Sequence, residues 1–107
     1  MIYASRLFAG AALLAGAALV STGVVAQTVS IGTLPQGSLA YGIASAAAKV
    51  MSDKAGLTTR AVGFGGSNIF IPQVNQGRIE MSTANAVEAH FAKDGTGTFP
   101  GRKNPNL

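Results

Sequence analysis

The chain has 107 residues, no cysteine, 48% hydrophobic residues and a formal net charge of +4. The absence of cysteine excludes a disulfide scaffold, a thiolate metal site and a lipoprotein anchor, which needs a cysteine directly after its leader. The few positive charges form no basic stripe with interleaved aromatic residues, so the composition also argues against nucleic-acid binding.

The first element is an apolar segment, residues 7–26, which follows the basic residue Arg6 and ends in two valines and Ala26. A charged start, an apolar middle and small residues at the end are typical of a secretory signal peptide. We therefore expect cleavage after Ala26 and a periplasmic protein. A retained membrane anchor is the alternative, because about twenty apolar residues span a bilayer. Glycine, serine and threonine dilute this run, however, and no basic stop-transfer cluster follows it.

The remaining residues 27–107 are long enough for one small domain. They hold all four carboxylates and every lysine and arginine except Arg6, which gives a net charge of +3. The high hydrophobic content of the whole chain therefore reflects the leader more than this domain.

The first predicted strand, residues 29–31, stops at Gly32 and leads through a loop to a long helix over residues 39–55. Ser38 is a suitable N-cap for that helix, and Gly56 stands where a glycine commonly ends one. Apolar residues recur at spacings of four, four and three, which predicts an amphipathic helix. The expected buried face consists of Leu39, Ile43, Ala47 and Val50, with Ala46 and Met51 beside it.

The second predicted strand, residues 57–64, is broken by the loop 65–68, which supplies capping side chains for the next helix. That helix is expected over residues 69–76. Because Pro72 cannot donate a backbone hydrogen bond, the helix has to start near it or kink there.

A third strand is predicted over residues 78–83, and Asn85 caps a third helix over residues 86–93. The expected inner face of this helix is Val87, Ala89 or His90, and Phe91. Glycine, proline and polar residues then predict a loop over residues 94–105.

The element order β-α-β-α-β-α predicts an α/β fold with a parallel sheet. In such a sheet the loops 33–38, 65–68 and 83–85 lie at the carboxyl edge, where ligands bind. All three are rich in glycine, hydroxyl and amide groups, contain no carboxylate, and precede a helix N-terminus. Together they predict a site for a carboxylate or phosphate, although each loop alone also fits ordinary turn and capping chemistry.

No catalytic, cofactor or metal site is indicated. Gly32 and Gly37 have the spacing of a phosphate-binding loop, but the lysine and hydroxyl residue that should follow are missing. His90, the single histidine, fits a packed or surface role, and Glu80 a solvated charge at a strand end. Tyr41 lies one turn into the first helix, where its ring either packs or leans over the first loop to contact a ligand.

Several motifs resemble one family in order and spacing. The series begins with Ile31-Gly32-Thr33, Gly37 and Tyr41, and an alanine-rich helix comes next. It continues with Gly65-Gly66-Ser67-Asn68-Ile69 and then Val74-Asn75-Gln76-Gly77-Arg78-Ile79-Glu80-Met81. It ends with Thr83-Ala84-Asn85. This series resembles the TAXI-type solute-binding subunits of TRAP (tripartite ATP-independent periplasmic) transporters. The likeness extends from Val29 to about Phe91.

The resemblance implies a periplasmic binding protein of type II with two α/β lobes, of which residues 27–107 are part of the first. It implies no enzymatic activity and no cofactor. Its partners would be a small anionic or zwitterionic solute, an organic acid or amino acid bound through its carboxylate, and the membrane permease subunits. The first-lobe ligand contacts that the resemblance implies are Thr33, Tyr41, Gly66, Ser67, Asn68 and Asn85.

Two other classes of protein stay open from the residues. One is a membrane-anchored interaction module that keeps its leader. The other is a small secreted α/β enzyme for an anionic substrate, for which no nucleophile, base or metal set can be named.

Overall fold

The computed structural model describes Gly23 and residues 26–107. The predicted leader, residues 1–26, therefore lies outside the described residues apart from Gly23 and Ala26, and its cleavage stays a prediction. Within the described part, no helix has the length and apolar character needed to cross a membrane.

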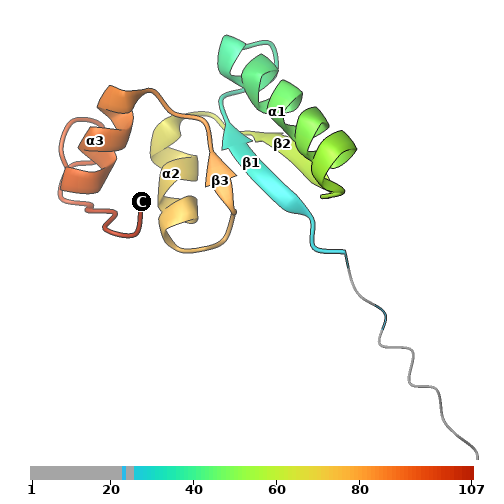
Figure 1. Ribbon diagram of the computed structural model, residues 1–107. Helices are drawn as coiled ribbons and strands as arrows, with labels where there is room; N and C mark the ends of the chain where they lie inside the picture. The colour runs from blue at the N-terminus through green and yellow to red at the C-terminus, as the bar shows by residue number, and fades with distance from the viewer. Residues whose placement is uncertain (1–22, 24–25) are drawn as a thin grey trace, which may run out of the picture.

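The described residues form an α/β domain with the predicted order of elements (Figure 1). The elements are β1 (Val29–Thr33), α1 (Leu39–Ala55), β2 (Thr59–Gly63), α2 (Ser67–Asn75), β3 (Met81–Ser82) and α3 (Ala86–Asp94). The strands form one parallel sheet in the order β2-β1-β3. This confirms the predicted α/β class and parallel sheet.

The strand β1 lies at the centre of the sheet. Val29 is in register with Thr59 of β2, and Ile31 is in register with Met81 of β3. At the carboxyl ends, the Phe64 backbone N–H donates to the Thr33 carbonyl at 2.8 Å, and the Thr83 N–H donates to the Gly32 carbonyl at 2.9 Å. Both later strand-to-helix loops are thereby tied to β1.

Helices cover both faces of the sheet. Ile31 is buried with Ala44 and Ala48 of α1, whereas the next residue of β1, Gly32, faces Phe70 of α2. Because successive residues of a strand point to opposite faces, α1 and α2 lie on opposite sides. In Figure 1, α3 lies beside α2, on the far side of the sheet from α1.

Strand β1 passes through Gly32, so the prediction that it stops there is wrong. A Cβ atom at Gly32 would lie 2.6 Å from Cδ1 of Ile79 and 3.1 Å from Cβ of Phe70. Glycine is needed here to let α2 approach the sheet closely, and it does not mark the end of the strand.

The caps of α1 are as predicted. The Ser38 hydroxyl accepts the Tyr41 N–H at 3.1 Å, and Gly56, at φ +65°, returns its N–H to the Met51 carbonyl. The predicted buried face is wrong, however. Ala44 and Ala48 are the buried residues of α1, whereas Leu39 is 82% exposed and Val50 is 59% exposed.

Helix α2 begins at Ser67, five residues before Pro72, and keeps that proline inside. The helix begins two residues before the predicted start at residue 69, so the alternative of a start near Pro72 is wrong, and the alternative of a kink at Pro72 stays a prediction. No side chain of the preceding loop caps α2, because its N-cap is Gly66, in an extended conformation.

Helix α3 has its predicted cap, but its inner face differs from the prediction. The Asn85 side chain accepts the Glu88 N–H at 2.8 Å. Ala92 is fully buried and Phe91 packs against the core, whereas Val87 is 60% exposed. The helix is rotated so that Glu88 and Ala92, four residues apart, lie on its inner side.

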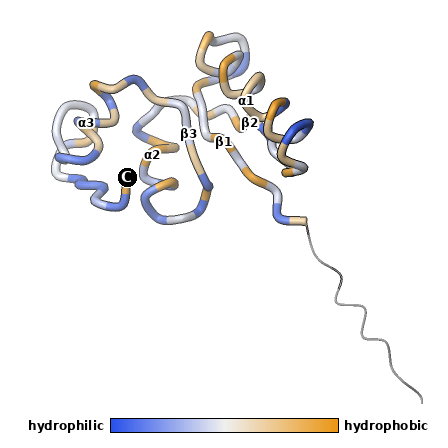
Figure 2. The backbone as a smooth tube through the Cα atoms, viewed as in Figure 1, coloured by the Kyte–Doolittle hydropathy of each residue, from blue (hydrophilic) through white to orange (hydrophobic). Residues whose placement is uncertain are grey.

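The segment after α3 is irregular, as predicted, and it contributes to the core. Its residues are largely hydrophilic (Figure 2), yet Phe99 is buried with Phe70 and Ile71 of α2. The buried Asn104 amide donates to the carbonyl oxygens of Ala92 at 2.8 Å and Arg102 at 3.0 Å. These contacts fix the segment against α3.

Candidate functional site

The three strand-to-helix loops meet at the carboxyl edge of the sheet, where the N-termini of α1, α2 and α3 also lie. Two hollows occur among the described residues at this edge. We call them the β3 hollow and the β2 hollow after the strand beside each.

The β3 hollow has a volume of about 600 Å³ and lies between the start of α1, the end of β3 and the start of α3. Most of its walls are apolar, and its polar groups come from the loop after β3 and from the two helix starts. Its lining residues are Leu34, Ser38, Leu39, Ala40, Ile43, Phe70, Ser82, Thr83, Ala84, Asn85 and Glu88.

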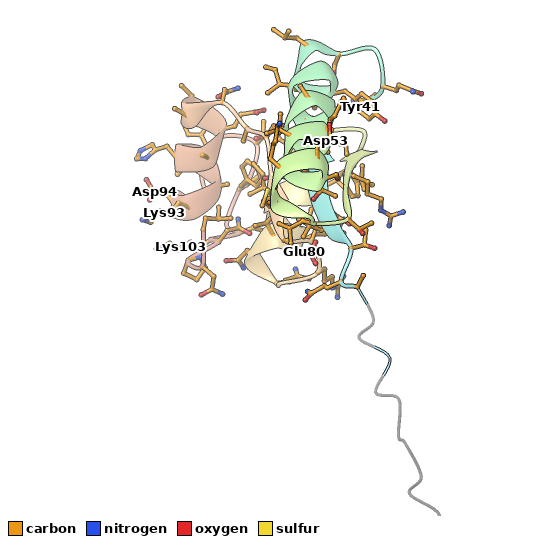
Figure 3. All side chains as sticks on the ribbon, turned by 45° about the vertical axis from the view of Figure 1, so that its right-hand side comes forward. Tyr41, Asp53, Glu80, Lys93, Asp94 and Lys103 are labelled. Carbon is orange, nitrogen blue, oxygen red and sulfur yellow. The ribbon has the colours of Figure 1, made fainter. Side chains whose placement is uncertain are left out.

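The β2 hollow has a volume of about 410 Å³ and is lined by Pro35, Gln36, Tyr41, Gly63, Phe64 and Gly65. It combines the loop after β1 with the loop after β2. Tyr41, one of the predicted contacts, is half-buried here. Figure 3 shows Tyr41 and Glu80 towards opposite ends of the domain, so Glu80 is remote from the β2 hollow, and it does not line the β3 hollow.

Two predicted contacts, Ser67 and Asn85, are joined through a residue that sequence reasoning missed. The Ser67 hydroxyl donates to Oε1 of Glu88 at 2.7 Å, and the Asn85 amide donates to Oε2 of the same carboxylate at 3.1 Å. The Glu88 N–H in turn donates to Oδ1 of Asn85 at 2.8 Å. The start of α2 and the start of α3 therefore share one carboxylate.

This carboxylate changes the electrostatics of the edge. The sequence predicts loops without acidic side chains, whereas the structure brings Glu88 from the first turn of α3 into the β3 hollow. A negative charge is favourable at these positive helix ends. The signal for it was present, since Asn85 followed by Glu88 three residues later has the spacing of a capping box.

Thr33 is fully buried at the end of β1. Its hydroxyl oxygen accepts from the hydroxyl of Thr83 at 2.7 Å, and Thr83 itself lines the β3 hollow. Thr33 therefore supports the hollow from beneath, and a direct ligand contact by Thr33 stays a prediction.

Gly66 and Asn68 lie at the start of α2, outside the lining of both hollows. A Cβ atom on Gly66 would lie 2.6 Å from Oδ1 of Asn68, so glycine at this position allows the Asn68 side chain to keep its observed conformation. Asn68 is exposed. The predicted contacts are thus divided: Ser67 and Asn85 meet at Glu88, whereas Tyr41 lines the other hollow.

The remaining titratable groups form no further site in the described residues. His90 is exposed, with Nε2 3.2 Å from Oδ2 of Asp94 on the same helix. No group of three or more histidine, aspartate or glutamate side chains placed to hold a metal ion occurs within this part of the chain.

Glu80 has a structural role at the other end of the sheet. Its carboxylate accepts the Ser30 backbone N–H at 2.7 Å, and this hydrogen bond lowers the pKa of Glu80 from its ordinary value of 4.5. The side chain supplies a hydrogen bond to β1 just before β3 begins at Met81, where β3 is only two residues long.

The chain matches no protein-family model, no curated protein and no solved structure.

Proposed function

We propose that this protein is the periplasmic solute-binding subunit of a TRAP-type transporter of the TAXI family. The described α/β unit would be part of the first lobe of a type II periplasmic binding protein. It would bind a small organic acid or amino acid and deliver it to the membrane permease, without enzymatic activity.

The observation that carries this proposal is the meeting of three strand-to-helix loops beside two hollows at one sheet edge. Parallel α/β sheets bind ligands at this edge, and helix N-termini there favour a carboxylate. The β2 hollow suits a carboxylate best, because its lining residues in the described part of the chain are all uncharged. A solute of a few carbon atoms fits a hollow of this size.

The proposal is tested by nuclear magnetic resonance of the ¹⁵N-labelled protein, titrated with small organic acids and amino acids. We expect saturable shifts confined to one or more of the loops 33–38, 65–68 and 83–85 and to the helix starts after them. Shifts spread over the whole domain, or none at millimolar concentration, would contradict solute binding at this edge.

A second measurement addresses secretion and the transporter. The intact mass of the protein released with the native periplasmic fluid shows whether the leader is removed after Ala26 and whether further chain is attached. A protein that stays with the membranes would instead favour the anchored interaction module.

A further inference from the structure

The β3 hollow contains a carboxylate whose position is fixed from two helices. Oε1 of Glu88 accepts from the Ser67 hydroxyl at 2.7 Å, and Oε2 accepts from the Asn85 amide at 3.1 Å. Ser67 is only 6% exposed, so one of the two donors is held in the interior. A carboxylate has about four acceptor positions, and these two bonds leave the remainder for a ligand in the hollow.

Glu88 has no cationic partner in the part of the chain that the structure describes. The ion pairs there are Lys49 with Asp53 and His90 with Asp94. Among the described residues that line the β3 hollow, Glu88 is the charged one. The Glu88 carboxylate would therefore repel an anion bound in the β3 hollow and attract a cation bound there.

The apolar residues that line the rest of the β3 hollow favour a ligand with an apolar body. Leu34 and Phe70 form part of its wall, and Leu39 and Ile43 of α1 border it from the other side. Leu39 is 82% exposed and Ile43 is 55% exposed, so both have apolar surface available to a ligand. Covering such surface stabilises a complex in proportion to the apolar area removed from water.

From this arrangement we propose that the β3 hollow binds a primary ammonium group attached to an aliphatic body, with Glu88 as the partner of the ammonium. The inference rests on the proposed function and narrows it: of the organic acids and amino acids considered, the solute is an amino compound with an apolar side chain. Ser67 and Asn85 are positioning residues that hold the carboxylate.

The test compares three probes that share one branched aliphatic body: 3-methylbutylammonium, L-leucine and 4-methylpentanoate. Each is titrated into the ¹⁵N-labelled full chain, and the amide shifts of Ser67, Asn85 and Glu88 are followed. We expect 3-methylbutylammonium and L-leucine to move these resonances saturably and 4-methylpentanoate to leave them in place.

The variant Glu88→Gln keeps the shape of the side chain and removes its charge. We expect it to weaken binding of 3-methylbutylammonium by about tenfold or more, the loss typical of a charge-assisted hydrogen bond. Binding of 4-methylpentanoate is expected to stay the same or to tighten. A variant that merely folds poorly would weaken both. Asp94→Asn removes one charge from the far end of the same helix and serves as the matched control.

Three results would overturn the inference. If 4-methylpentanoate binds at the edge and 3-methylbutylammonium does not, the ammonium site is wrong while solute binding stands. If no probe produces a shift, both the inference and the proposed function fail. Equal binding of 3-methylbutylammonium to the protein and to Glu88→Gln would also refute the role of the carboxylate.

Discussion

The close approach of α2 to the sheet at Gly32 leads to a prediction with a definite sign. In the substitution Gly32→Ala, the new Cβ would lie 2.6 Å from Cδ1 of Ile79 and 3.1 Å from Cβ of Phe70. The first atom ends a side chain that is itself buried, and the second lies next to the α2 backbone. The Ile79 side chain has to change its conformation, and because Cβ of Phe70 is fixed to the α2 backbone, α2 has to move slightly away from the sheet.

The cost follows from what is known of overpacked cores. Adding a methyl group to a well-packed interior destabilises a protein by about 1–3 kcal/mol. In a domain of this size each kcal/mol lowers Tm by about 4–8 °C, so a loss of about 2 kcal/mol shifts the midpoint by about 8–16 °C. The substitution also carries the usual small gain of replacing glycine, about 0.5–1 kcal/mol, so the net loss is about 1 kcal/mol and the net fall in Tm is about 4–8 °C.

Gly42 provides the matched control. It lies within α1, is exposed, and a Cβ atom there would meet no other atom within 4 Å. Gly42→Ala is therefore expected to stabilise the protein by about 0.5–1 kcal/mol through helix propensity alone.

Both variants are compared with the parent protein by thermal and urea unfolding, followed by circular dichroism at the helix band. We expect opposite signs for the two substitutions. If Gly32→Ala unfolds at the same temperature as the parent or higher, α2 does not pack on β1 as described.

Three further predictions concern the core, a helix cap and the acid limb of stability. Phe99→Ala is expected to lower the free energy of unfolding by about 3–5 kcal/mol, because Phe99 is buried in the larger core cluster; an unchanged urea midpoint would show that the C-terminal segment does not contribute to the core. Asn85→Ala removes the cap of α3 and should cost about 0.5–2 kcal/mol, with faster amide exchange at Glu88; unchanged exchange would contradict the cap. The pKa of Glu80 is lowered in the folded protein. The stability that the ionised Glu80 carboxylate contributes is therefore present above the pKa of this group in the unfolded chain and is lost as the pH falls through its pKa in the folded protein. Glu80→Gln should therefore unfold with a midpoint that changes less than that of the parent between about pH 6 and about pH 3, and equal acid sensitivity of the two proteins would refute this.

The starts of α1 and α3 and the order of elements could be predicted because they depend on local chemistry. Ser38 and Asn85 cap α1 and α3 through hydrogen bonds within three residues, and Gly56 takes the left-handed conformation that its position after a helix suggests. Such interactions need no knowledge of the rest of the fold.

The buried face of α1 could not be predicted, because two apolar stripes have the same helical period. Large residues at Leu39, Ile43 and Val50 outweigh alanines in any pattern of hydrophobicity. In the structure the alanines face the sheet, since Ala44 and Ala48 let the helix backbone lie close to Ile31. Which stripe is buried depends on the distance between helix and sheet, a tertiary property.

The candidate site could be predicted only in part, because part of it also depends on tertiary packing. The topology brings the loop residues to one edge, which the order of elements already implies. The contact between Ser67 and Glu88 joins residues 21 positions apart and depends on how α3 rotates against α2. The rotation that buries Ala92 also carries Glu88 inward, and neither follows from the apolar pattern of residues 86–93.

The central position of β1 has a consequence for the order in which the domain assembles. β1 comes first among the three strands in the sequence, yet both of its neighbours are later segments, β2 and β3. No strand pair in the sheet forms between strands joined by a tight hairpin, so every pairing closes a long loop, a feature associated with slow folding. When the chain is synthesised from its N-terminus, β1 has both edges open until β2 (Thr59–Gly63) has appeared, and one edge stays open until β3 (Met81–Ser82) has appeared. A chaperone that protects extended, unpaired strands would act during that interval.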